Sequence, residues 1–303
     1  MQTRRRSDQR ITIIAGGFYA ASGESMCQPV IAPWPVAVVL WLLSAAALPA
    51  VNADPDKEDN RGATIDPSLA RRLLAELPDI QSFRANPTDQ FLVDFEQIRS
   101  GHPYLGKQSN TPHTGGHIHF VIPDEPIDSV RPERFPAIYA MADGYVSRVD
   151  YSFRLREVFN QQLQRSVANT RYGIDLVFAT LEGHPVSMHY SIEPFTDPGD
   201  NRFYDKFVLV RVGQKVRKGD LIARMYIHPD RRMSGGTHIH FNLIGGKDHR
   251  FMAPAIFSRN VTDRFHERWR DFGRDGDERI PACMGYRLSA EENPFGTGAV
   301  RTL

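Results

Sequence analysis

Two segments of the chain alternate polar and apolar residues in nearly the same way. Residues 235–243 read Gly-Gly-Thr-His-Ile-His-Phe-Asn-Leu, and residues 115–120 read Gly-Gly-His-Ile-His-Phe. Successive side chains of a strand point to opposite faces. The pattern therefore predicts two strands, each with one apolar face for a core and one face that carries a pair of histidines.

The two pairs are His117 with His119 and His238 with His240, and His113 stands just before the first pair. Two imidazoles on one strand face can share a metal ion, or one can bind metal while its neighbour moves a proton. A single His-x-His motif is as often a pair of surface histidines on an edge strand. Here five of the 11 histidines gather in two short segments that begin with glycines, and this clustering favours a functional site.

From about residue 112 onward, short apolar alternations separated by turn residues predict an antiparallel sheet. In the segment that follows the Glu182-Gly183 turn, His189 lies on the face opposite Met188 and Tyr190, so it can join the other imidazoles. Residues 152–170 are expected to form an inserted loop or a short helix. The runs expected to form strands are residues 137–140 and 145–149 around a tight turn, 174–179, 186–191 and 208–223.

Helix signals lie on both sides of this region. Asp66-Pro67 is typical of a helix start, and the leucines that follow recur at helical spacing. A second helix is expected from about Thr88 to Arg99, and a third from Val261 to Phe272 in a tail that packs on the domain. Residues 54–65 and those after about Glu291 lack periodicity and are expected to be disordered.

Residues 1–53 are interpreted as a signal peptide. The apolar run from Pro35 to Pro49 is shorter than the roughly 20 residues of a membrane span. Small residues at Val51-Asn52-Ala53 fit a cleavage site, and the distance of the N-terminal arginines from the apolar run suggests Met26 as the true start. We therefore expect an exported protein, periplasmic or extracellular, with no stable membrane span after cleavage. An uncleaved membrane anchor is the alternative.

Composition excludes other classes of protein. The 303 residues are 41% hydrophobic, enough for a large core, and carry a net charge of +1. The body of the chain contains neither a basic run nor a phosphate-binding glycine loop, so we expect no nucleic-acid partner. Cys27 lies in the signal segment and leaves Cys283 alone, so no intramolecular disulfide is expected.

An ordered set of motifs carries a family resemblance. The motifs are His113-Thr114-Gly115-Gly116-His117, residues 140–146, Tyr172-Gly173, His189-Tyr190, residues 210–222 and His238-Ile239-His240-Phe241. Their order resembles that of the lysostaphin-type (LytM-like) zinc endopeptidases, which have a duplicated hybrid motif fold and cut peptide bonds in bacterial peptidoglycan. The similarity covers roughly residues 110–245. It implies a mostly β fold, an antiparallel sheet or barrel-like sandwich, with a short helical N-terminal segment and a partly helical tail outside it.

The resemblance also implies roles for single residues. It makes His113 and His240 ligands of Zn²⁺, and it places His189 and His238 beside the water that attacks the peptide bond. The third ligand of the family is an aspartate, and His117 holds that position here. Three imidazoles also make a tetrahedral zinc site with one open position.

Two further residues remain candidates for that third ligand. His119 faces the same way as His117 and could replace it, and Asp124 follows a few residues later. The remaining histidines lie outside the motifs and are expected at the surface: His102, His184, His228, His249 and His266.

The expected function is that of an exported zinc endopeptidase with a peptidoglycan peptide as substrate. The alternative is a catalytically inactive LytM-like domain that binds cell wall or regulates another hydrolase, which the histidine at the aspartate position favours. A cupin-like barrel also uses His-x-His, but its downstream glutamate is not at the expected spacing. We expect a linker and helical segment at 54–109, the metallopeptidase domain at 110–245 and an extension at 246–303, with the oligomeric state open.

Overall fold

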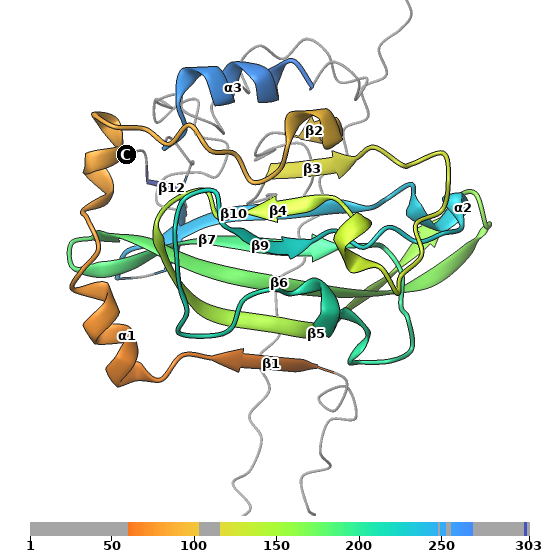
Figure 1. The fold of residues 1–303 in the computed structure, drawn as a ribbon, viewed down its shortest axis with the longest axis horizontal. Helices are drawn as coiled ribbons and strands as arrows, with labels where there is room; N and C mark the ends of the chain where they lie inside the picture. The colour runs from red at the N-terminus through yellow and green to blue at the C-terminus, as the bar shows by residue number, and fades with distance from the viewer. Residues whose placement is uncertain (1–59, 103–115, 248, 253–255, 269–299, 302–303) are drawn as a thin grey trace, which may run out of the picture. The chain divides into compact units, whose positions relative to one another are not determined.

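A computed structural model describes residues 60–102, 116–247, 249–252, 256–268 and 300–301 (Figure 1). Ten strands of this part form one sheet, in which β1, β5, β6, β7 and β10 follow one another. At the far side of β10, one half of that strand pairs with β3 and the other half with β11. Next to these, β2 pairs with β3 and β12 with β11, while β8 pairs with β5.

The strands of this sheet are β1 (Arg61–Thr64), β2 (Ile98–His102), β3 (Gly116–Phe120), β5 (Gly144–Asn160), β6 (Arg165–Leu181), β7 (His184–Glu193), β8 (Lys215–Val216), β10 (His238–Gly245), β11 (Arg250–Met252) and β12 (Val300–Arg301). All pairs of neighbouring strands are antiparallel except β11 with β12. The predicted mostly β, antiparallel fold is therefore confirmed. Within the described residues the sheet stays open and forms no closed barrel.

One face of the large sheet carries the core. Ile118, Tyr172, Tyr190, Ile239 and Phe241 point from four of its strands into a single buried cluster. A second sheet of two strands, β4 (Ala137–Tyr139) and β9 (Leu221–Arg224), lies in front of the large sheet in Figure 1. Buried tyrosines join the two layers, because their hydroxyls donate to carbonyls of the small sheet, at 2.5 Å for Tyr172 and 3.2 Å for Tyr190.

Short helices lie around the sheets. They are α1 (Pro67–Leu74), α2 (Arg231–Ser234), α3 (Arg259–His266) and the 3₁₀ turns at Ile80–Arg84, Phe95–Gln97, Pro132–Arg134 and Phe203–Phe207. The predicted first helix is confirmed, with Asp66 accepting hydrogen bonds from its first turn. Leu73 of α1 packs on Tyr145 and Val177 in a small second core. No helix of the described residues is long and apolar enough to cross a membrane.

Three expectations about local structure were wrong. Residues 152–170 are not an insertion but the outer half of a long hairpin formed by β5 and β6. Residues 137–140 and 145–149 do not pair with each other, because β4 pairs with β9 in the second sheet. No α-helix forms between Thr88 and Arg99, since Phe91, Leu92 and Val93 are buried in succession and a one-sided helix cannot bury them all.

The ends of the described chain also join the fold. Residues Arg61–Thr64, expected to be part of a linker, pair with β5 as β1. In the tail, Val261 and Phe265 of α3 are buried in the main core. Val300–Arg301 pair with β11 as the short strand β12. The predicted signal peptide lies outside the described residues.

Candidate functional site: the polar face of the sheet

The two histidine strands are direct neighbours. Antiparallel pairing of β3 with β10 sets His117 opposite His240 and His119 opposite His238, with Ile118 opposite Ile239 between them. Residues directly opposite each other in a sheet share a face. All four imidazoles therefore lie on the face of the sheet that points away from the core, as the alternation in each segment predicted.

The four rings are in close contact. Ring centroids are 4.3 Å apart for His117 and His238, 4.9 Å for His117 and His240, 5.0 Å for His119 and His238, and 5.8 Å for His117 and His119. Imidazoles that bind one tetrahedral zinc ion through nitrogens at about 2.0–2.1 Å have ring centres roughly 5 Å apart. The ring spacing is therefore of the order expected for imidazoles that share a zinc ion. As placed, no three metal-binding side chains of the described residues converge tightly enough to hold one.

His189 extends this face by one strand. It stands on β7 opposite Asn242 of β10, and His240 is its diagonal neighbour. Side chains in such a diagonal pair lie about 7–8 Å apart. On its other side His189 pairs with Asp175 of β6, and its Nδ1 is hydrogen-bonded to the Asp175 carboxylate. The structure thus brings His189 to the same face as the four clustered imidazoles.

In two of the clustered rings, a hydrogen bond to a neighbouring group engages one particular ring nitrogen. The Nδ1–H of His238 donates to the carbonyl oxygen of Gly236 at 2.7 Å, which directs its Nε2 toward Glu193, 3.6 Å away. In His240 it is Nε2 that lies 3.3 Å from Oδ1 of Asn242. A histidine that binds metal through one nitrogen usually donates a hydrogen bond from the other. The contact with Asn242 therefore engages Nε2 of His240.

A buried arginine stands beside His189. Arg171 on β6 stacks on Phe153, with its guanidinium carbon 4.5 Å from the ring centre, and forms an ion pair of 3.3 Å with Asp150. Burial lowers the pKa of Arg171, and the negative charges of Asp150 and Glu193 oppose that shift. The arginine therefore remains a fixed positive charge among carboxylates at the edge of the imidazole cluster.

The other candidates named from the sequence differ in what the structure describes of them. His113, the first expected zinc ligand, lies outside the described residues. The side chain of Asp124 is 96% exposed and pairs with Arg231 at 3.4 Å. His184 and His249 are exposed, as expected. His102 pairs through its backbone with His117, and its expected surface exposure stays a prediction.

Sequence reasoning missed two acidic residues of this face. Asp175 contacts His189, and Glu193 accepts a hydrogen bond from Ser191 at 2.8 Å while facing His238. Glu193 continues the alternation of His189 and Ser191 along its strand, and that signal was available in the sequence. Asp175 required knowledge of the register between β6 and β7.

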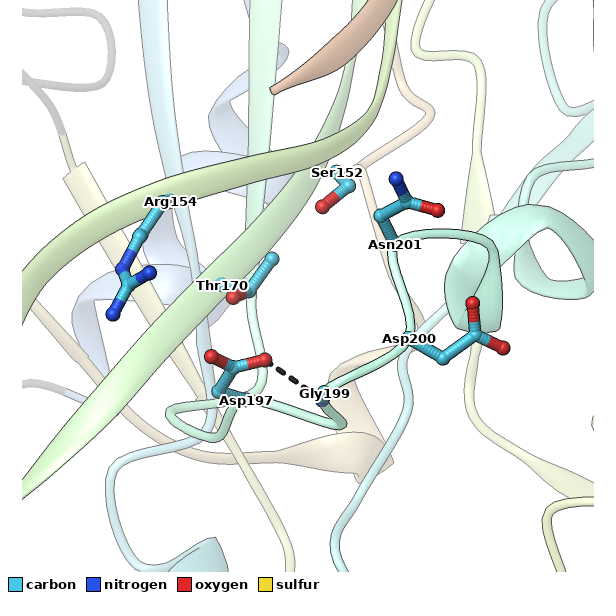
Figure 2. Close-up of a pocket in the computed structure, with 7 residues that line it drawn as sticks. All are labelled: Ser152, Arg154, Thr170, Asp197, Gly199, Asp200 and Asn201. Carbon is cyan, nitrogen blue, oxygen red and sulfur yellow. Dashed lines mark hydrogen bonds between the residues drawn. The ribbon is translucent and has the colours of Figure 1, made fainter. Parts of the chain in front are cut away.

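A separate polar cavity of about 490 Å³ lies between the long hairpin and the loop after β7 (Figure 2). Thr170 lines it, whereas the next residue, Arg171, points to the imidazole face, so β6 separates the cavity from the imidazoles. We place the chemistry at the imidazole cluster, because no histidine lines the cavity. Its lining residues are Ser152, Arg154, Thr170, Asp197, Gly199, Asp200 and Asn201.

No protein-family model and no curated protein sequence matches this chain. Among solved structures, the chain is similar to one described as the NMR solution structure of lysostaphin, at 12% sequence identity and a TM-score of 0.25. The similarity covers 71% of this chain and 61% of that chain, so this chain spans less than two thirds of the length of that structure. A similarity at this level assigns neither a fold nor a function.

Proposed function

We propose that this chain is an exported, zinc-dependent endopeptidase that hydrolyses peptide bonds of bacterial peptidoglycan. The observation that carries the proposal is the pairing of β3 with β10, which gathers four imidazoles on one face with ring centroids 4.3–5.8 Å apart. The order of the sequence motifs, which resembles that of the LytM-like endopeptidases, supports the choice of substrate.

His113, His117 and His240 are the proposed zinc ligands, and His119 is the substitute for His117. His117 is preferred because it stands directly opposite His240, with ring centroids 4.9 Å apart. Zinc bound there would lower the pKa of a water molecule to about 7 and polarise the carbonyl of the scissile bond. Three neutral imidazoles leave more positive charge on such a site than two imidazoles and a carboxylate do.

His189 and His238 are the proposed proton-transfer residues. When the oxygen of water bonds to the carbonyl carbon, an imidazole accepts a proton from that water. It then gives the proton to the amine nitrogen as the carbon–nitrogen bond breaks. A protonated imidazole next to the carbonyl oxygen also stabilises the oxyanion of the tetrahedral intermediate. In both residues Nδ1 is hydrogen-bonded to an acceptor of the protein, and Nε2 is the proposed proton-transfer atom; in His238 this atom lies 3.6 Å from the Glu193 carboxylate.

A second candidate function is wall binding or regulation without catalysis. His117 in place of the expected aspartate favours it. In that case the imidazole face would bind wall material and hold no stoichiometric metal. The same experiment separates the two functions.

The test uses the protein with its signal segment removed, purified and analysed for bound zinc, then incubated with purified peptidoglycan sacculi. We expect near-stoichiometric zinc, release of soluble fragments, loss of activity with a chelator and its recovery when zinc is returned. Binding to sacculi without release of fragments, by a metal-free and folded protein, would reject the endopeptidase and support the second candidate. A His184→Ala variant, altered at the exposed first residue of β7, is the matched control and should behave as the wild type.

A further inference from the structure

We infer that Asp175 is a positioning residue for catalysis: it fixes the ring of His189 so that Nε2 is the atom that exchanges protons. This inference rests on the proposed function, because it concerns the orientation of one of the two proposed proton-transfer histidines. Asp175 itself need not touch the substrate.

The hydrogen bond between the two side chains determines where the proton of the imidazole lies. Nδ1 of His189 meets Oδ1 of Asp175 across the paired strands β7 and β6. An ionised carboxylate only accepts hydrogen bonds, so Nδ1 carries the hydrogen and Nε2 keeps its lone pair. A neutral imidazole in this form accepts a proton only at Nε2, and the carboxylate then stabilises the positive charge that forms on the ring.

A bulge in β6 creates this contact. Close to the turn, Leu181 pairs with His184 and Ala179 with Val186, and at this register His189 would stand opposite the apolar Leu176. The register shifts by one residue between Val177 and Ala179, so that Asp175 takes the place opposite His189. Bulges of this kind re-aim side chains next to functional sites.

Asp175 has no substitute in holding the ring. Among the residues that the structure describes, it is the hydrogen-bond partner of the His189 imidazole. On the neighbouring side, the ring lies over Gly173, where a Cβ would come within 3.7 Å of His189 Cε1. The two side chains are 16% and 23% exposed, so solvent reaches the pair but does not surround it. Removing the carboxylate therefore leaves the ring free to rotate and to change tautomer.

Two variants at this position separate positioning from stability. Asp175→Asn keeps the shape of the side chain but can donate from its amide and so favour the wrong tautomer, and Asp175→Ala removes the partner. We expect both variants to keep their zinc and their KM for sacculi, and to lose about 10²–10⁴-fold in kcat. Asp89→Asn makes the same chemical change at an exposed carboxylate that pairs with Lys218, and it should leave kcat unchanged.

A second readout does not need turnover. Nitrogen-15 NMR of the whole protein reports which ring nitrogen carries hydrogen, and the signals of His189 are identified by their loss in a His189→Ala variant. The wild type should show hydrogen on Nδ1, whereas both Asp175 variants should show a mixture or the opposite tautomer. A residue that only stabilised the fold would not change this ratio.

The outcomes distinguish this inference from the proposed function. If His189→Ala abolishes hydrolysis while both Asp175 variants keep the wild-type kcat and tautomer, the inference is overturned and the proposed function stands. If the wild type hydrolyses nothing, the proposed function fails and takes the catalytic role of Asp175 with it. The NMR ratio then decides only whether Asp175 orients the ring.

Discussion

The guanidinium of Arg171 lies over Gly173, two residues further along the same face of β6. A Cβ placed on Gly173 would come within 2.9 Å of Arg171 Nη1 and 2.8 Å of the carbonyl oxygen of Tyr190. The arginine can shift, but the carbonyl belongs to the paired strand β7 and moves only if the sheet distorts. Gly173 therefore keeps open the space between Arg171 and the ring of His189.

Replacing Gly173 by alanine should destabilise the fold, because the new methyl group meets backbone on one side. We expect a loss of about 1–3 kcal/mol in the free energy of unfolding, as for other overpacked sites. Urea denaturation measures it. Gly235→Ala is the matched control, since a Cβ there meets nothing within 4 Å, and it should stay within about 0.5 kcal/mol of wild type. Equal stabilities for the two variants would contradict this account of the polar face.

Variants of the histidines should divide into two classes. His240→Ala and His117→Ala should lose bound zinc, because each removes a proposed ligand. His189→Ala and His238→Ala should keep zinc and lose about 10²–10⁴-fold in kcat, the contribution of positioned proton transfer. Metal analysis and hydrolysis of sacculi are measured on the same preparations. If His189→Ala and His238→Ala both kept full activity, the division between ligands and proton-transfer residues would be wrong.

His119→Ala decides between the two neighbouring candidates for the third ligand. If His117 binds zinc, the His119 variant should retain stoichiometric metal, although its ring lies 5.0 Å from that of His238. Loss of zinc in the His119 variant together with its retention in the His117 variant would exchange their roles. Zinc content after dialysis is the measurement.

Asn242→Ala should weaken zinc binding without removing a ligand. Oδ1 of Asn242 lies 3.3 Å from Nε2 of His240, a contact that can fix the orientation of this proposed ligand ring. Loss of such an outer partner typically costs about 10–100-fold in metal affinity. Competition with a chromophoric chelator measures the change, and Asn86→Ala, at an exposed asparagine, is the control. Unchanged affinity would mean that Asn242 does not orient His240.

Phe265→Ala should show that the C-terminal helix is an integral part of the core. The ring is fully buried, with centroid distances of 5.3 Å to Phe91 and 6.1 Å to Phe241. Removing a buried phenylalanine ring costs about 3–5 kcal/mol. Thermal or urea unfolding should register this loss, while Arg259→Ala on the exposed side of the same helix should change little. A small effect of Phe265→Ala would place the helix outside the cooperative unit.

The histidine strands could be predicted from sequence because alternation specifies a face without any knowledge of partners. In both segments the apolar residues between and after the histidines are buried, and the histidines lie on the other face. That these two faces are adjacent was an expectation from the family resemblance and from the repeated motif. The pairing of His117 with His240 agrees with it.

The contact between Asp175 and His189 could not be predicted from sequence. Residue-by-residue counting from the Glu182-Gly183 turn pairs His189 with Leu176, and only the bulge corrects the count. Phe178, at the bulge, is fully buried with its ring 5.3 Å from that of Phe83, a contact distant in sequence. The register therefore depends on tertiary packing that no local pattern records.

The long hairpin and the missing helix were mispredicted for related reasons. The outer half of β5 is partly exposed on both faces, with Phe159 exposed, so it carries little apolar alternation to indicate a strand. In the segment near Phe91, apolar residues occur at helical spacing by coincidence, and burial on several sides selects an extended chain.

The pairing of Ile118 with Ile239 at the centre of the two histidine strands makes the imidazole face depend on the register of β3. A slip of β3 by one residue would turn Ile118 toward solvent and both of its histidines toward the hydrophobic interior. The burial of Ile118 and Ile239 in the core thus fixes the register of β3. This register holds both histidines of the strand on the outer face of the sheet. A mutation that weakens the packing of Ile118 would therefore disturb the arrangement of the four imidazoles as well as the core.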